Sequence, residues 1–123
     1  MKRITLLWPA SALWQNRRHH WADRTRATKE ARRWAWAAAK EARVESNPNA
    51  YLKFTFHPPT KRLPDMQNMP ATQKAAIDGI ADAMQVDDSG FRCIWPLEFA
   101  EPVKGGSVIV EIFNELEHRG TIT

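Results

Sequence analysis

The sequence contains little cysteine and glycine, and it has no long run of hydrophobic residues. Cys93 is the single cysteine among 123 residues, which excludes an intrachain disulfide framework and a zinc site made of cysteines. Only 5 residues are glycine, whereas 43% are hydrophobic and 26% charged, which favours a packed core over a fibrous or disordered chain. No segment approaches the roughly 20 apolar residues that a membrane span requires. These absences predict a soluble cytoplasmic protein with no membrane partner.

The length favours one domain over residues 1–123, because a chain this short rarely builds two hydrophobic cores. The N-terminus superficially resembles an export signal, since basic residues precede an apolar run. That run extends only from Ile4 to Trp8 before Pro9, shorter than the roughly 7–15 residues of an export signal core. We therefore expect a single domain that is not exported.

Hydrophobic periodicity predicts the regular elements. Leu52, Phe54 and Phe56 alternate with residues of the opposite face, which is typical of a half-buried strand. A second helix is expected to start at Asn68 or Met69 and to bury Ile77, Ile80 and Met84. The expected order is strand, helix, strand, helix, strand, strand, over residues 3–8, 29–43, 51–56, 68–84, 92–99 and 107–113.

Two finer expectations concern these elements. The first helix, dense in good helix formers, is expected to be capped by Thr25 or Thr28. Its core-facing residues are expected to be Ala31, either Trp34 or its neighbour Ala35, Ala38 and Ala42. The segment 101–106 reads as a turn that joins the last two strands in a hairpin.

Charge is unevenly distributed along the chain. Between residues 17 and 43 there are nine basic residues against three acidic ones, whereas between 65 and 88 there are five acidic residues against one lysine. A basic segment that gathers phosphates, beside an acidic segment that holds a divalent cation, is the layout of a metal-dependent nuclease. The plainer interpretation of the basic segment is a solvated helix face. Trp36 lies one turn from both Arg32 and Lys40, where it could stack on a base or pack at a subunit interface.

The acidic segment has a more specific pattern. Lys74, Asp78 and Asp82 are spaced four apart and share one polar face of the second helix. Asp65 precedes this helix and the pair 87–88 follows it. If these carboxylates converge, hard oxygen ligands favour Mg²⁺ or Mn²⁺ over zinc. The alternative is that they are surface carboxylates, with Lys74 and Asp78 forming a weak i,i+4 pair.

Gly79 stands in the middle of this helix. A glycine there costs about 1 kcal/mol relative to alanine, so it usually marks the close approach of another group.

Together these residues resemble the signature region of the RusA family of Holliday-junction resolvases, which is common in phages and prophages. The family pattern is Asp-x-Asp-Asn, a lysine at the start of a helix, an aspartate one turn later and an Asp-Asp pair past the helix. The matching segments are 65–69, 73–80 and 86–88. Looser likeness covers the rest of the chain: a first strand ending in Trp8-Pro9, an arginine-rich loop and helix, and the 104–106 turn.

The chain departs from the family pattern at two places. Gln67 replaces the second aspartate of Asp-x-Asp-Asn, which family members use as a metal ligand, and residues 70–72 are additional. A glutamine offers an uncharged amide oxygen and would hold Mg²⁺ more weakly. Either Asp78 compensates, or the site is attenuated, or activity has been lost.

The resemblance implies an α+β fold with a mixed sheet, and a homodimer that places two active sites on a two-fold symmetric four-way junction. It implies an Mg²⁺-dependent (or Mn²⁺-dependent) endodeoxyribonuclease that resolves Holliday junctions or other branched DNA. Asp65, Asp78 and Asp88 are then the metal ligands, and the catalytic set is Asp65, Lys74, Asp78, Asp87 and Asp88. Lys74 stabilises charge on the phosphate. The residues expected to bind nucleic acid are Arg17, Arg18, Arg24, Arg32, Arg33 and Trp36.

Two other classes of function remain open from the sequence. One is a catalytically attenuated module that binds branched DNA, for which Gln67 is the best support. The other is a small interaction protein whose carboxylates are surface residues. The second class predicts that Asp65, Asp78 and Asp88 do not converge in space.

Overall fold

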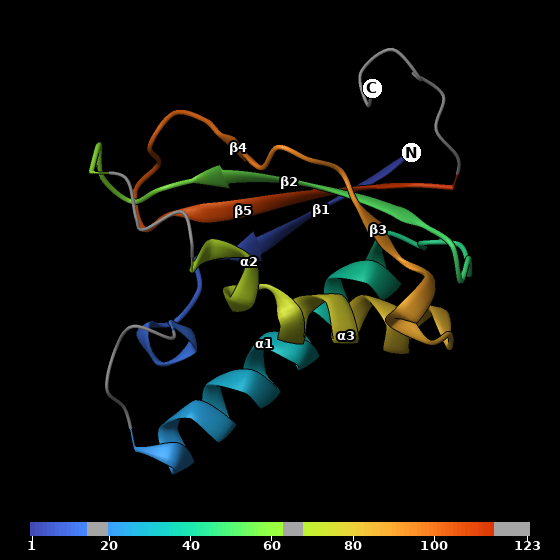
Figure 1. The fold of residues 1–123 in the computed structure, drawn as a ribbon, viewed down its shortest axis with the longest axis horizontal. Helices are drawn as coiled ribbons and strands as arrows, with labels where there is room; N and C mark the ends of the chain where they lie inside the picture. The colour runs from blue at the N-terminus through green and yellow to red at the C-terminus, as the bar shows by residue number, and fades with distance from the viewer. Residues whose placement is uncertain (15–19, 63–67, 115–123) are drawn as a thin grey trace.

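The computed structural model of the protein describes residues 1–14, 20–62 and 68–114. They form a single small α+β domain with a mixed sheet, as predicted (Figure 1). The strands are β1 (Lys2–Leu7), β2 (Tyr51–His57), β3 (Arg92–Cys93), β4 (Glu98–Phe99) and β5 (Ser107–Phe113). The helices are α1 (Trp21–Glu41), α2 (Met69–Thr72) and α3 (Lys74–Met84), with short 3-10 helices η1 (Ser11–Leu13) and η2 (Asp88–Gly90).

The sheet places β5 between β1 and β2. β5 is antiparallel to both neighbours, with Ile4 opposite Val110 and Phe54 opposite the same residue from the other side. β3 and β4 both run parallel to β2, β3 along its first residues and β4 along its last. β1 is thus an edge strand, paired on one side only among the described residues.

The core lies between one face of the sheet and the helices α1 and α3, which lie on the same side of it (Figure 1). Alternate residues of the three long strands are buried there, so the expected alternation in β2 is confirmed. The α3 residues Ile80 and Met84 are buried, as expected, and Ile77 packs at the edge of the core. The buried strand residues are Ile4, Leu6, Leu52, Phe54, Phe56, Val108, Val110 and Ile112.

Helices α1 and α3 cross in close contact at Gly79. A Cβ atom on Gly79 would lie 2.2 Å from the carbonyl oxygen of Arg32 and 3.0 Å from the Cβ of Ala35. The close approach that a mid-helix glycine predicts is therefore confirmed. The approaching group is the backbone of α1, so Gly79 has a packing role.

The expected hairpin of the last two strands is wrong, because β5 pairs with β1 and β2 instead. The expected strand over residues 92–99 is also broken into β3 and β4, each two residues long. Pro96 lies between them and has no N–H to donate to a ladder. The turn residues favoured the hairpin. In the centre of the sheet, however, every second side chain of β5 is buried on the face that meets the core.

The helices also differ in their bounds from the prediction. α1 begins at Trp21, and the Nδ1 atom of His20 caps it by accepting from the N–H of Ala22 at 3.2 Å. Thr25 and Thr28 are not caps, since their hydroxyls donate back to carbonyls inside the helix. The second predicted helix is divided at Gln73 into α2 and α3.

The buried stripe of α1 was predicted only in part. Ala35 is fully buried as expected, and Ala39 was missed. Of the two alternatives at this position, Ala35 faces the core and Trp34 is 49% exposed. The angle between Trp34 and Ala35 on a helix is about 100°, and α3 occupies the side nearer Ala35.

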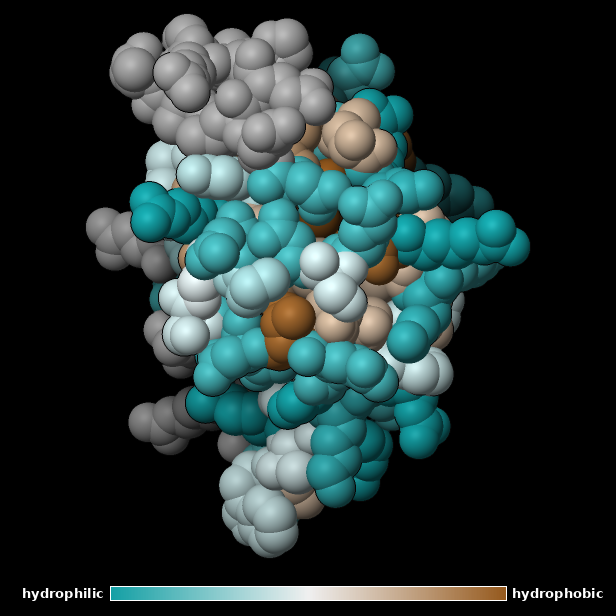
Figure 2. Space-filling model, turned by 90° about the vertical axis from the view of Figure 1, so that its right-hand side faces the viewer, coloured by the Kyte–Doolittle hydropathy of each residue, from teal (hydrophilic) through white to brown (hydrophobic). Residues whose placement is uncertain are grey.

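No helix among the described residues is long and apolar enough to cross a membrane. Figure 2 shows the face at the right-hand side of Figure 1, where hydrophilic residues cover most of the surface. Hydrophobic residues appear on it only as small separate areas, so the described part of this face carries no broad apolar patch.

Candidate active site

Lys74, Asp78 and Asp88 converge at the start of α3, and we call them the Lys74 cluster. The Nζ atom of Lys74 donates to Oδ1 of Asp78 at 2.9 Å and to Oδ2 of Asp88 at 2.6 Å. The two carboxylates are about one quarter exposed, at 26% and 29%, so they are open to solvent on one side. Two acidic groups and one cation from separate turns thus meet in one accessible place.

The chain reverses after α3, and this reversal brings Asp88 back to Lys74. Gln85 ends the helix in the left-handed conformation, with φ of 60°, and the N–H of Val86 donates to the carbonyl of Ala81 at 3.1 Å. Such a helix end turns the following residues back along the helix. Asp88 then reaches the first turn of α3 although 14 residues separate it from Lys74.

The η2 turn that carries Asp88 is held from two sides. The carboxylate of Asp87 accepts from the N–H of Ser89 at 2.9 Å and so caps the turn. A Cβ atom on Gly90 would lie 2.2 Å from the carbonyl oxygen of Pro48, which shows how closely η2 packs on the preceding loop. Asp87, predicted as a catalytic carboxylate, therefore acts here as a cap that positions its neighbour Asp88.

The charges of the cluster stabilise one another. The hydrogen bond from Lys74 lowers the pKa of Asp88, and the hydrogen bonds to Asp88 and Asp78 raise the pKa of Lys74. At neutral pH Asp88 is therefore ionised and Lys74 is protonated. Lys74 can neutralise negative charge on a bound group, but it cannot serve as a base in this state.

We expect the Asp88 carboxylate to titrate below its ordinary pKa, and Lys74→Met to raise that pKa. A carboxylate with a lowered pKa contributes stability at neutral pH that is lost as the pH falls through its folded-state pKa. A carboxyl-detected NMR titration checks this, with Asp82 as the internal control. The pKa of Asp82 is lowered by Arg32 and should stay low in Lys74→Met. An unchanged Asp88 midpoint in that variant would contradict the assignment.

A second ion pair joins the two long helices. Nε and Nη2 of Arg32 donate to the two carboxylate oxygens of Asp82 at 2.6 Å and 2.9 Å. Asp82 raises the pKa of Arg32, with smaller contributions from Asp78 and Asp88. Arg32 was predicted to bind nucleic acid, but its guanidinium is used within the protein to hold α1 against α3. It lies within electrostatic range of the Lys74 cluster.

The outer face of α1 carries a line of exposed cationic residues and one tryptophan. The spacing of three and four residues places them on one face of the helix. Trp36, 43% exposed, stands among them as predicted. Of the ion pairs that described residues form, only one uses this face, between Arg26 and Asp23 at 3.2 Å. We call the set the basic stripe; its members are Arg26, Lys29, Arg33, Trp36 and Lys40.

Four of the predicted site residues belong neither to the Lys74 cluster nor to the basic stripe. Asp65, Arg17 and Arg18 lie outside the described residues, as does the departure at Gln67. Arg24 is exposed near the start of α1. Of the predicted metal ligands, the described residues bring together Asp78 and Asp88.

The donor chemistry of the Lys74 cluster suits a divalent cation of the Mg²⁺ type. Mg²⁺ is usually held by one or two carboxylates, with waters and substrate phosphates completing the shell. Asp78 and Asp88 supply two carboxylates, and both already bind one cation, the ammonium group of Lys74. Within the described residues no group of three or more His, Cys, Asp or Glu side chains could hold a metal.

Sequence reasoning missed several residues of this region. Lys29 and Lys40 were counted as charges but not named as binding residues, although their spacing from Arg33 was a signal for a shared face. Gln73 was also missed, and no local pattern marks it. It is 5% exposed, and its role depends on a cavity that only the folded chain forms.

The fold and the cluster define a small α+β domain with a partly exposed group of one lysine and two aspartates on α3, which packs against the cationic helix α1. No family model matches the chain. Over 119 residues it is 39% identical to an uncharacterized protein of Xylella fastidiosa (strain Temecula1 / ATCC 700964), an alignment that covers 91% of this chain and 76% of that protein. The chain belongs to the same family as this protein.

Proposed function

We propose that the protein is a RusA-like, metal-dependent endodeoxyribonuclease that cleaves Holliday junctions or other branched DNA. The observation that carries the proposal is the meeting of Lys74, Asp78 and Asp88 through two short hydrogen bonds. The resemblance in residues 65–69, 73–80 and 86–88 supports it, since these residues occupy the positions of the family signature. The convergence also argues against a set of unrelated surface carboxylates.

The residues of the cluster divide the work by their charge. Asp78 and Asp88, with Asp65, hold the Mg²⁺ or Mn²⁺ ion; when bound, the ion supplies Lewis-acid polarisation of a phosphoryl oxygen. Lys74 stays protonated and donates to a phosphate oxygen, which offsets the charge that develops there. Asp87 positions Asp88 through the cap of η2.

The basic stripe binds the phosphate backbone of the DNA. Its cations lie along one exposed face of α1, and among the described residues only Arg26 of the stripe forms an ion pair. Phosphate contacts of this kind orient a duplex without reading its sequence. The stripe therefore supplies affinity for the DNA backbone that does not depend on sequence, and Arg17, Arg18 and Arg24 are proposed as further backbone contacts.

Replacing Lys29 and Lys40 together with glutamine should weaken DNA binding and reduce its dependence on salt. If both contact phosphates, the log–log slope of affinity against salt falls by up to about two units. Fluorescence anisotropy in EDTA over a salt series measures this. The charge-matched control replaces Lys2 and Lys104, which lie on β1 and in the turn before β5. Equal slopes for the two double variants would refute a specific role of the stripe.

A homodimer acting in the cytoplasm is the proposed working form. A four-way junction has approximate two-fold symmetry, and paired cleavage of opposing strands asks for two symmetric active sites. Light scattering that shows twice the chain mass supports this, and a monomer at micromolar concentration in physiological salt contradicts it.

The second candidate function is a catalytically attenuated module that binds branched DNA. Gln67 favours it, because the position offers an uncharged amide where the family pattern has a metal-binding carboxylate. The basic stripe serves this function equally well. A cleavage assay on synthetic four-way junctions with and without Mg²⁺ separates the candidates: paired nicks support the nuclease, and tight binding without cleavage in Mg²⁺ or Mn²⁺ supports the binding module.

A further inference from the structure

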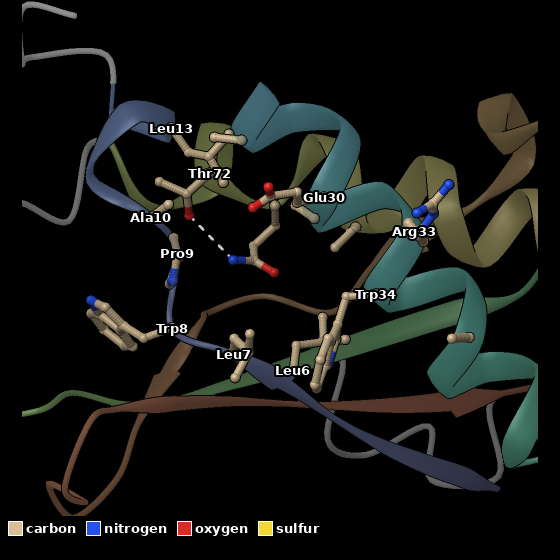
Figure 3. Close-up of a pocket in the computed structure, with 15 residues that line it drawn as sticks. Leu6, Leu7, Trp8, Pro9, Ala10, Leu13, Glu30, Arg33, Trp34 and Thr72 are labelled. Carbon is tan, nitrogen blue, oxygen red and sulfur yellow. Dashed lines mark hydrogen bonds between the residues drawn. The ribbon is translucent and has the colours of Figure 1, made fainter. Parts of the chain in front are cut away.

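A largely apolar cavity of about 520 Å³ opens between α1, the end of β1 and the start of α3. The end of β1 forms its floor, and η1, α1 and the junction of α2 with α3 form its walls (Figure 3). In Figure 3 the indole rings of Trp8 and Trp34 stand on opposite sides of it, with Leu6 and Leu7 between them. Trp34 and Leu7 are 49% and 63% exposed, so the apolar surface is open to an occupant. The size falls within the range of about 300–1,000 Å³ that is usual for ligand sites.

The cavity wall contains a buried hydrogen-bond acceptor without a donor. Gln73 lines the cavity and is 5% exposed, and among the described residues its Oε1 atom has no hydrogen-bond partner. Buried polar atoms are rarely left unpaired, so such an atom in a cavity indicates a missing donor.

The orientation of this amide is set by Thr72. The Thr72 hydroxyl donates its only proton to the carbonyl of Met69 at 2.7 Å, so towards Gln73 it can only accept. The amide nitrogen of Gln73 must therefore face Thr72, and it does so at 3.3 Å, the bond marked by the dashed line in Figure 3. The amide oxygen is directed away from Thr72 and has no donor among the described residues.

The basic stripe reaches the same cavity through Arg33. Arg33 belongs to the stripe and also lines the cavity, with Glu30 near it on α1. A polyanion whose phosphates follow the stripe therefore passes the mouth of an apolar cavity. This neighbourhood favours an occupant that is attached to a phosphate backbone over a free apolar molecule or a protein side chain.

We propose that the cavity binds an unpaired nucleobase of the DNA, stacked on Trp34 and donating an N–H group to Oε1 of Gln73. This inference rests on the proposed binding of branched DNA and names the feature that is recognised. Every nucleobase has a flat apolar face and at least one N–H donor. The flat face complements the exposed indole of Trp34, and the N–H group complements the unpaired Oε1 atom of Gln73. Stacking on aromatic side chains is the usual way in which proteins hold unstacked bases, and branch points supply such bases.

The test compares two DNA duplexes in EDTA, so that cleavage plays no part. One carries a single bulged nucleotide, and the other has an abasic residue at the same bulge. We expect the wild-type protein to bind the bulged base at least about fivefold more tightly than the abasic bulge. Trp34→Leu and Gln73→Met should each bring the two affinities together while leaving the affinity for a fully paired duplex unchanged.

Trp21→Leu is the matched control, because Trp21 is 73% exposed on the same helix and does not line the cavity. It should keep the preference for the bulged base. Gln73→Met should change the melting temperature little, since the loss of the long 3.3 Å hydrogen bond to Thr72 is offset by the removal of an unpaired buried oxygen. A loss of preference in that variant therefore reports binding and not unfolding.

The outcomes separate this inference from the nuclease proposal. Equal wild-type affinities for the base and the abasic bulge overturn the inference, even if junctions are cleaved in Mg²⁺. A base preference without cleavage supports the cavity and counts against the enzyme. A dimer that Trp34→Leu converts to a monomer, with no base preference in either form, overturns the inference because the cavity is then an interface between two copies.

Discussion

Replacing Lys74 with methionine is expected to lower the rate of junction cleavage in Mg²⁺ by at least about a hundredfold. Lys74 is the only cation bonded to both carboxylates of the cluster among the described residues, and it stays protonated at neutral pH. Its loss removes the charge that offsets the developing negative charge on the phosphate. DNA binding in EDTA should weaken, because the carboxylates of Asp78 and Asp88 then lack their cation and repel the phosphates, but the untouched basic stripe on α1 should keep most of the affinity.

Asp88→Asn should also abolish cleavage, but with a different effect on binding. Removing a negative charge near the phosphates reduces repulsion, so metal-free binding is preserved or tightened. Glu98→Gln is the control for loss of a carboxylate. Glu98 pairs with Lys53 on the sheet at 3.3 Å, away from the cluster, and its variant should cleave at the wild-type rate.

Single-turnover cleavage of a labelled four-way junction over a Mg²⁺ series measures these effects. If Lys74→Met and Asp88→Asn cleave as fast as the wild type, the Lys74 cluster is not the active site. If the wild type itself binds junctions tightly but never cuts them in Mg²⁺ or Mn²⁺, the binding module replaces the nuclease as the function.

Gly79→Ala is expected to destabilise the fold by about 2 kcal/mol or more, although alanine is the better helix former by about 1 kcal/mol. The added Cβ would lie 2.2 Å from the backbone carbonyl oxygen of Arg32 and 3.0 Å from the backbone nitrogen of Trp36. Backbone atoms cannot rotate away as the end of a side chain can, so the two helices must separate. Separation opens the core and strains the ion pair between Arg32 and Asp82.

Urea denaturation of Gly79→Ala, and of Gly79→Val with its larger side chain, measures this cost. The control is Gly105→Asn, in a turn where a Cβ meets nothing within 4 Å and φ is +80°. Asparagine tolerates that left-handed conformation, so its effect should be small. A Gly79→Ala variant as stable as the wild type would show that α1 and α3 are not held in the described contact.

The three long strands and the central part of each long helix could be predicted because their signals are local, whereas the expected strand over residues 92–99 is broken into β3 and β4. In β2 and α3 the period of the hydrophobic residues matches the geometry of the element, and burial follows that period. The predicted ends of the helices were less accurate, because a residue caps a helix only where the backbone enters it from an extended conformation. His20 caps α1, whereas the more typical cap residues Thr25 and Thr28 lie inside the helix.

The Lys74 cluster was half predictable. Lys74 and Asp78 lie four residues apart on one helix, so their contact follows from the helical period alone. Asp88 joins them only because Gln85 adopts a left-handed conformation and η2 packs against Pro48. Neither event has a strong local signal, and the convergence was suggested by the family resemblance.

By itself, then, the sequence determined the single α+β domain, the alternating strands, the cationic face of α1 and the carboxylates of α3. Only the tertiary structure decided that β5 lies between β1 and β2, that Arg32 is paired with Asp82, and that Gln73 faces an apolar cavity. The physical reason is the range of the interactions. Periodicity and charge act between residues a few positions apart, whereas strand order, ion pairs across 50 residues and cavities depend on which buried faces fit together in space.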